Sequence, residues 1–107
     1  MCVLALRTTM KLVRDRIPQI IIEDGRTPIY HIAEPEEYKR ELFRKVIEEL
    51  EEFREDPCLE EAADLFEVAH TLVEAHGLSF AEIVDTGMRK SQLVGGFNRG
   101  IILDNVE

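Results

Sequence analysis

The sequence contains no tryptophan, only two cysteines, and aromatic residues at just 7% of its 107 positions. Cys2 and Cys58 lack the paired spacing of a zinc site and are too few for a disulfide framework. We therefore expect a reducing compartment, the cytoplasm. No apolar run is long enough to cross a bilayer, so no membrane partner is expected. The apolar residues 1–6 have no cationic stretch before them, so a signal peptide is not predicted.

Basic residues are also scarce, because 13 Lys and Arg face 22 Asp and Glu and give a net charge of −9. Such a chain is poorly suited to binding nucleic acid or anionic membranes. Its carboxylates can instead recruit a hard divalent cation, which can then recruit phosphate. Hydrophobic residues make up 45% of the chain, so it should fold, and its length suggests one domain with a modest core. Pairing with a second copy would enlarge that core.

Capping and breaking residues divide the chain into four expected helices. The ranges are about 17–24, 35–54, 57–76 and 79–93. Two segments rich in β-branched and aromatic residues, 27–33 and 97–103, are predicted as short strands. We expect a mainly all-α fold: an antiparallel helix bundle of residues 10–107, with one or two peripheral strands and residues 1–9 as a loose extension. The signals are Pro18, Gly25, Pro35, Asp56-Pro57, Gly77, the capping box Ser79-x-x-Glu82 and Gly95-Gly96.

Four carboxylates lie where the two central helices should meet. Glu49 and Glu52 stand one turn apart at the border of the first apolar face, and Glu61 and Asp64 flank the second. The short linker predicts antiparallel packing, which would gather all four at one end of the pair. Several other acidic residues of these helices are expected to face water: Glu41, Glu51, Glu60, Glu67 and Glu74. Glu48 also points toward water but could still join the cluster as a neighbour.

Four gathered carboxylates repel one another and raise their own pKa values unless a cation compensates them. Oxygen ligands of this type suit Mg²⁺, with Mn²⁺ as a substitute. The same spacing also occurs on ordinary solvated helix faces, and the residues alone leave both interpretations open.

Basic side chains near such a site could balance the charge of a phosphate substrate. The candidates are Arg14, Arg16, Arg89 and Lys90, each of which could equally be a surface residue. Lys45 precedes Glu49 by one turn and could pair with it or orient it.

The pattern Glu49-x-x-Glu52 followed by Glu61-x-x-Asp64 resembles the signature of the MazG-like superfamily of all-α nucleotide pyrophosphohydrolases. Residues 11–18, Lys-Leu-Val-Arg-Asp-Arg-Ile-Pro, look like the opening of a subgroup labelled phosphoribosyl-ATP pyrophosphohydrolase-like. Residues 61–68 look like its second metal helix, and Gly95-Gly96-Phe97 with residues 101–103 looks like its C-terminal end. The resemblance covers residues 10–104.

The resemblance implies Mg²⁺-dependent cleavage of a nucleotide between its α and β phosphates, giving a monophosphate and pyrophosphate. Glu49, Glu52, Glu61 and Asp64 would then be the metal ligands and catalytic residues, with no base assigned among them. Lys90 resembles a basic position of the family and is the preferred phosphate contact, beside Arg14, Arg16 and Lys45. A homodimer or homotetramer is also implied.

Two features depart from the family pattern. Only residues 53–60 separate the two halves of the motif, and Val94 stands where a basic residue is expected. The substrate could be a noncanonical or surplus nucleotide or phosphoribosyl-ATP. Two other classes of protein also fit the sequence. One is a non-catalytic dimerisation or regulatory module that binds metal or nucleotide, and the other is a purely structural helix bundle.

Overall fold

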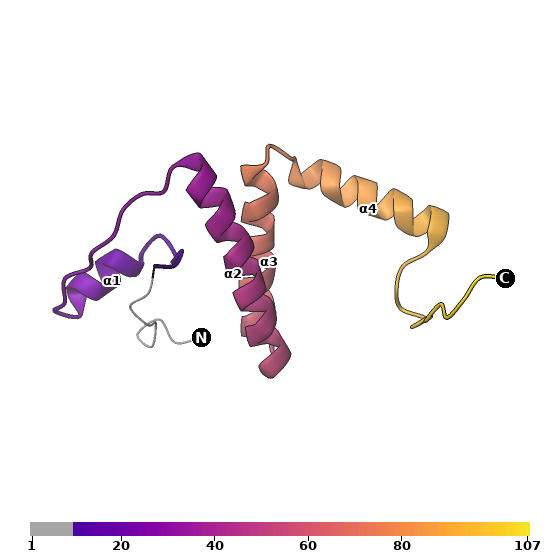
Figure 1. Cartoon of the computed structure of the whole chain (residues 1–107), viewed down its shortest axis with the longest axis horizontal. Coiled ribbons are helices and arrows are strands. Elements are labelled where there is room, and N and C mark those ends of the chain that lie inside the picture. The colour runs from indigo at the N-terminus through magenta and orange to yellow at the C-terminus, as the bar shows by residue number, and fades with distance from the viewer. Residues whose placement is uncertain (1–9) are drawn as a thin grey trace.

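The computed structural model describes residues 10–107, and this part of the chain is all-helical, as predicted (Figure 1). The expected extension at residues 1–9 lies outside the described residues. Every helix boundary falls within two residues of its predicted position. The four helices are α1 (Ile17–Glu23), α2 (Pro35–Glu55), α3 (Leu59–Ala75) and α4 (Phe80–Val94).

Local chemistry explains where the helices begin and end. Pro35 occupies the first turn of α2, after an extended Glu34, where its fixed φ and missing N–H cost nothing. Gly77 follows α3 with φ of +77°, a conformation that favours glycine. The Ser79 hydroxyl accepts a hydrogen bond from the Glu82 backbone N–H at 3.3 Å, which caps α4 as predicted. The cap expected at Asp56 is wrong, because α3 begins two residues later, after Cys58.

Both predicted strands are wrong, because residues 27–33 and 97–103 form no strand in the described chain. A strand needs a neighbour that satisfies its backbone groups, and an isolated extended segment is not stable. Ile29 is 99% exposed and Phe97 is 98% exposed, so these two apolar side chains are not packed on a sheet or a helix of the described chain. The β-branched and aromatic residues of these two segments therefore form exposed apolar surface and do not pair as strands.

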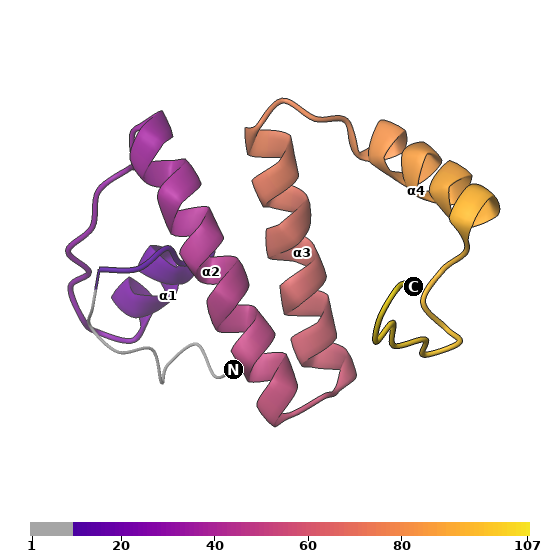
Figure 2. The ribbon, with the colours of Figure 1, turned by 45° about the vertical axis from the view of Figure 1, so that its right-hand side comes forward.

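Only part of the predicted bundle forms within one chain. α2 and α3 pack side by side as an antiparallel pair, with α1 on the α2 side and α4 leaving on the α3 side (Figures 1 and 2). The chain extends over 62 × 31 × 24 Å. Of the described residues, Ile17 and Leu42 are the buried apolar ones. None of the described helices combines the length and apolar character that crossing a bilayer would require.

A candidate metal centre between α2 and α3

Two of the four buried residues in the described chain are glutamates. Glu49 on α2 is 2% exposed and Glu61 on α3 is 5% exposed. Burying a carboxylate costs free energy unless a cation or hydrogen-bond donors compensate it. A merely solvated helix face would not bury these two side chains, so they require a specific explanation.

Three of the four predicted ligands converge. Glu49, Glu61 and Asp64 each contribute one carboxylate oxygen to a group in which all three atoms lie within 4.8 Å of one another. They meet because α2 and α3 run antiparallel and the short loop between them places the end of α2 beside the start of α3. Glu52, one turn beyond Glu49, is half-buried and stands outside this group.

The ionisation of Glu49 reflects its position. Burial raises the pKa of the Glu49 carboxyl, Lys45 opposes part of this rise, and Asp64 and Glu48 add to it. Lys45 Nζ lies 3.5 Å from Glu49 Oε1. The other oxygen, Oε2, is buried and has no hydrogen-bond partner. The Oε2 atom of this buried carboxylate is therefore available to bind another ligand.

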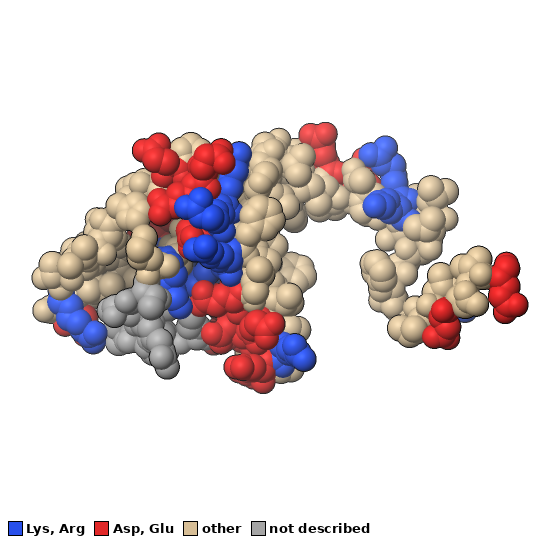
Figure 3. Space-filling view, viewed as in Figure 1, with Lys and Arg blue, Asp and Glu red and all other residues tan. Residues whose placement is uncertain are grey.

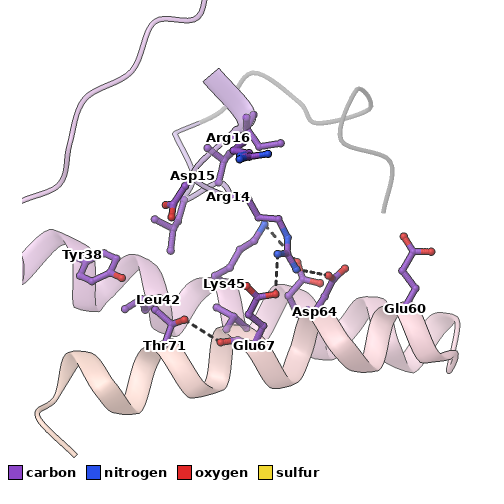
Figure 4. Close-up of a pocket in the computed structure, with 15 residues that line it drawn as sticks. Arg14, Asp15, Arg16, Tyr38, Leu42, Lys45, Glu60, Asp64, Glu67 and Thr71 are labelled. Atoms are coloured by element: carbon purple, nitrogen blue, oxygen red, sulfur yellow. Dashed lines mark hydrogen bonds and ion pairs between the residues drawn. The ribbon is translucent and has the colours of Figure 1, made fainter. Parts of the chain in front are cut away.

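Arg14 approaches the cluster from the segment before α1. Its Nη2 donates to Asp64 Oδ1 at 2.7 Å, and its Nη1 lies 2.8 Å from Glu67 Oε1 (Figure 4). These hydrogen bonds raise the pKa of the Arg14 guanidinium. Glu67 was predicted to face water, and its side chain is 63% exposed, but it also pairs with Arg14, which was not predicted. The periodicity of α3 contains no signal for a contact made by a residue outside the helix.

Two lysines contact Glu48, which was predicted to point toward water or to join the cluster as a neighbour. Lys11 Nζ and Lys45 Nζ each lie 3.3 Å from Glu48 Oε1. Glu48 is half-buried. Lys45, with a side chain only 11% exposed, therefore pairs with both Glu48 and Glu49. This confirms the predicted pairing of Lys45 with Glu49.

A pocket of about 530 Å³ opens beside the cluster (Figure 4). This volume is within the range of small-molecule sites. Residues 12–17 form one wall and α2 and α3 form the others. The lining includes predicted ligands and predicted phosphate contacts together: Arg14, Arg16, Lys45, Glu49 and Asp64.

Lys90 and Arg89 are not brought to this pocket. Lys90 instead lines a separate depression, which is formed by the loop after α3 and by α4 as far as Lys90. Arg89 pairs with Asp85 at 3.1 Å along α4. Within one chain, the basic groups near the carboxylates therefore come from α2 and from the segment before α1.

Charge is unevenly distributed over the surface. Acidic side chains gather at the end of the α2–α3 pair that carries the connecting loop, and basic side chains follow α2 above it (Figure 3). Four of the six residues 51–56 at that end are acidic: Glu51, Glu52, Glu55 and Asp56. A negative potential of this kind attracts a cation toward the neighbouring carboxylates.

Comparison with known proteins gives no assignment. No family model matches the chain, and no curated protein or solved structure matches it significantly.

Proposed function

We propose that the protein is a Mg²⁺-dependent nucleotide pyrophosphohydrolase. The convergence of Glu49, Glu61 and Asp64 carries this proposal, because three oxygens from two helices meet beside a pocket of ligand size. The orphaned Oε2 of Glu49 supports it independently of the acidic cluster. The motifs that resemble the MazG-like superfamily supply the choice of reaction.

The donor set fits a hard cation. All three groups are carboxylates, and Mg²⁺ is usually bound through one or two carboxylates while it keeps several waters and contacts substrate phosphates, so the group offers enough oxygen ligands. A bound Mg²⁺ would screen phosphate charge and lower the pKa of a coordinated water. Glu52 would join only by turning toward the group from its position one turn away.

The basic residues of the pocket wall fit the phosphate chain. Arg14 offers a planar fork of donors that suits phosphate oxygens. Arg16 lines the same wall. Lys45 is already engaged with Glu48 and Glu49, so we propose that it holds the ligand Glu49 in place and contacts substrate only secondarily.

The overall reaction consumes one water. Its oxygen forms a bond to phosphorus as the α–β anhydride bond breaks, and the products are a nucleoside monophosphate and pyrophosphate. The pocket accommodates a nucleotide in size, but its lining does not favour one base. The panel of substrates to test therefore includes canonical and modified nucleoside triphosphates and phosphoribosyl-ATP.

The test is pyrophosphate release from this panel with Mg²⁺ and with EDTA. We expect Mg²⁺-dependent release by the wild type and its loss in the double variant Glu49→Gln, Asp64→Asn. Glu51→Gln, a neighbouring exposed carboxylate on α2, is the matched control and should retain activity. Release that persists in the double variant would exclude this site.

The non-catalytic binding module is separated from the enzyme by the same samples. A bound metal or nucleotide stabilises the folded state by mass action whether or not it is turned over. Metal-dependent stabilisation lost in the double variant, with no pyrophosphate released from any nucleotide, would favour that module.

A further inference from the structure

The pocket beside the candidate metal centre has two chemically different ends. α2 and α3 run antiparallel, so the residue order along one helix matches the reversed order along the other. On α2 the lining residues, from the charged end onward, are Glu49, Lys45, Leu42 and Tyr38. On α3, in the same direction in space, they are Glu60, Asp64, Glu67, Val68 and Thr71. Both helices therefore change from charged to uncharged residues toward the same end of the pocket.

Tyr38 marks the uncharged end. It is the one aromatic side chain among the described residues that line the pocket, and it is half-buried. Figure 4 shows Tyr38 at one end and Asp64 and Glu60 toward the other, with Leu42 between them. Tyr38 precedes Glu49 by eleven positions, which is about 16 Å along a helix. That span is comparable with the length of an extended nucleoside triphosphate.

Charge determines which way a nucleotide would lie. The Asp15 carboxylate lines the pocket on the Tyr38 side of Arg14 (Figure 4). A phosphate chain at that end would be repelled by Asp15, whereas at the other end it would meet Arg14 and any bound metal ion. The phosphates therefore belong at the carboxylate end, and the base of the same molecule then extends toward Tyr38.

The uncharged end offers a ring contact in preference to a fixed hydrogen-bond pattern. The Thr71 hydroxyl already donates its proton to the Glu67 backbone oxygen at 3.0 Å, so it is not free to donate to a base. An aromatic ring, in contrast, stacks on any base, because every base has a π-face. Such a contact selects for the presence of a base and not for its identity.

We propose that Tyr38 is the base-binding residue of the pocket, and that its ring stacks on the nucleobase of a nucleotide whose phosphates lie at the Glu49–Asp64 end. The ligand class is a nucleotide with any aromatic base. This assignment rests on the proposed function for the choice of a nucleotide as ligand. It adds to that function the orientation of the substrate and the residue that distinguishes a nucleotide from a bare phosphate chain.

Calorimetric titration in Mg²⁺ tests the proposal with two probes. Adenosine 5′-(α,β-methylene)triphosphate resists cleavage between the α and β phosphates, and inorganic tripolyphosphate supplies the phosphate chain without a base. Tyr38→Ala should weaken binding of the first probe roughly 5- to 100-fold and leave the affinity for tripolyphosphate unchanged. Tyr38→Phe keeps the ring and should bind both probes as the wild type does. Tyr30→Ala, at a 61% exposed tyrosine outside the pocket lining, is the matched control.

Tyrosine fluorescence gives a second measurement that does not depend on the alanine variant. The chain has no tryptophan, and its two tyrosines are Tyr30 and Tyr38. In Tyr30→Phe, Tyr38 is the sole remaining tyrosine, and the adenosine probe should quench its emission while tripolyphosphate should not. Tyr38→Phe retains Tyr30 alone, so it measures light absorption by the nucleotide itself and should show no further quenching.

Three results would overturn the proposal: no binding of the adenosine probe to the wild type, unchanged affinity for this probe in Tyr38→Ala, or an equal loss for tripolyphosphate. The last would mean that Tyr38 only supports the pocket wall. Pyrophosphate release judges the reaction separately. Binding of the adenosine probe that depends on Tyr38, without release from any nucleotide, would support the base-binding role of Tyr38 and reject the hydrolase.

Discussion

Arg14 and Asp64 lie fifty positions apart in the sequence, yet Arg14 Nη2 donates to Asp64 Oδ1 at 2.7 Å. The pair joins the segment before α1 to the first half of α3, and both residues line the pocket (Figure 4). In this arrangement a guanidinium occupies one flank of the carboxylate group that we propose to hold Mg²⁺. A metal ion and Arg14 would therefore compete for the Asp64 carboxylate.

Arg14→Ala is expected to tighten metal binding and to weaken nucleotide binding. Removing the competing cation leaves Asp64 more negative, but the Arg14 side chain is 51% exposed. An exposed ion pair contributes at most about 1 kcal/mol, which corresponds to roughly two- to fivefold tighter Mn²⁺ binding. Calorimetric titration of Mn²⁺ without nucleotide measures this, and Arg16→Ala is the control because it lines the same wall. Weaker Mn²⁺ binding in Arg14→Ala would show that Arg14 organises the ligands instead of competing with the metal.

The ionisation of Glu49 predicts a stability difference that depends on pH. Its pKa is raised by burial above the ordinary value of 4.5, so the folded state binds the proton more tightly than the unfolded state does. The stability contributed by this proton is fully present below 4.5 and is lost as the pH rises through the folded pKa. Without divalent cations, Glu49→Gln should therefore be more stable than the wild type at pH 7.5, and the difference should shrink toward pH 4.5.

Urea unfolding of both proteins in EDTA, at several pH values, measures this difference. Glu51→Gln, with an exposed side chain on the same helix, should show no such trend relative to the wild type. A Glu49→Gln variant that is less stable than the wild type at pH 7.5 would mean that the ion pair with Lys45 outweighs the cost of burial.

The two glutamates that flank the loop should differ in their importance for metal binding. Glu61 is buried within the group of converging oxygens, whereas Glu52 stands outside it. We expect Glu61→Gln to abolish most of the rise in melting temperature that Mg²⁺ produces, and Glu52→Gln to reduce it by a smaller amount. Thermal melts with and without Mg²⁺ compare the two. An equal loss in both variants would place Glu52 among the ligands, as the family pattern implies.

The sequence was sufficient to predict the helices and part of the site, for physical reasons that are local. Pro35, Gly77 and Ser79 act on the backbone within a few residues of themselves, so they define helix ends without knowledge of the fold. Helical periodicity likewise placed Glu49, Glu61 and Asp64 on facing edges, and the short loop brought those edges together.

Features that depend on distant segments were not predictable in this way. The pairing of Arg14 with Glu67 depends on how the segment before α1 returns to α3, which no periodicity encodes. The apolar spacing of Phe43 and Ile47 on α2 also does not say what covers these side chains, and in the described chain they stay 53% and 61% exposed. The strands predicted at 27–33 and 97–103 failed because composition records apolar character and does not say whether a neighbouring strand exists.

The small core makes Leu42 the position where a truncation should cost most. Leu42 on α2 is 1% exposed and lines the pocket wall near Ile17. Leu42→Ala should lower the free energy of unfolding by about 2–5 kcal/mol, the range for a buried leucine that leaves a cavity.

Leu50→Ala on the same helix removes the same atoms from a side chain that is 50% exposed. That truncation should cost much less, because half of the Leu50 surface is already in water. Urea unfolding of the two variants compares the two positions. Equal losses would show that Leu50 is packed as closely as Leu42, contrary to its exposure in the structure.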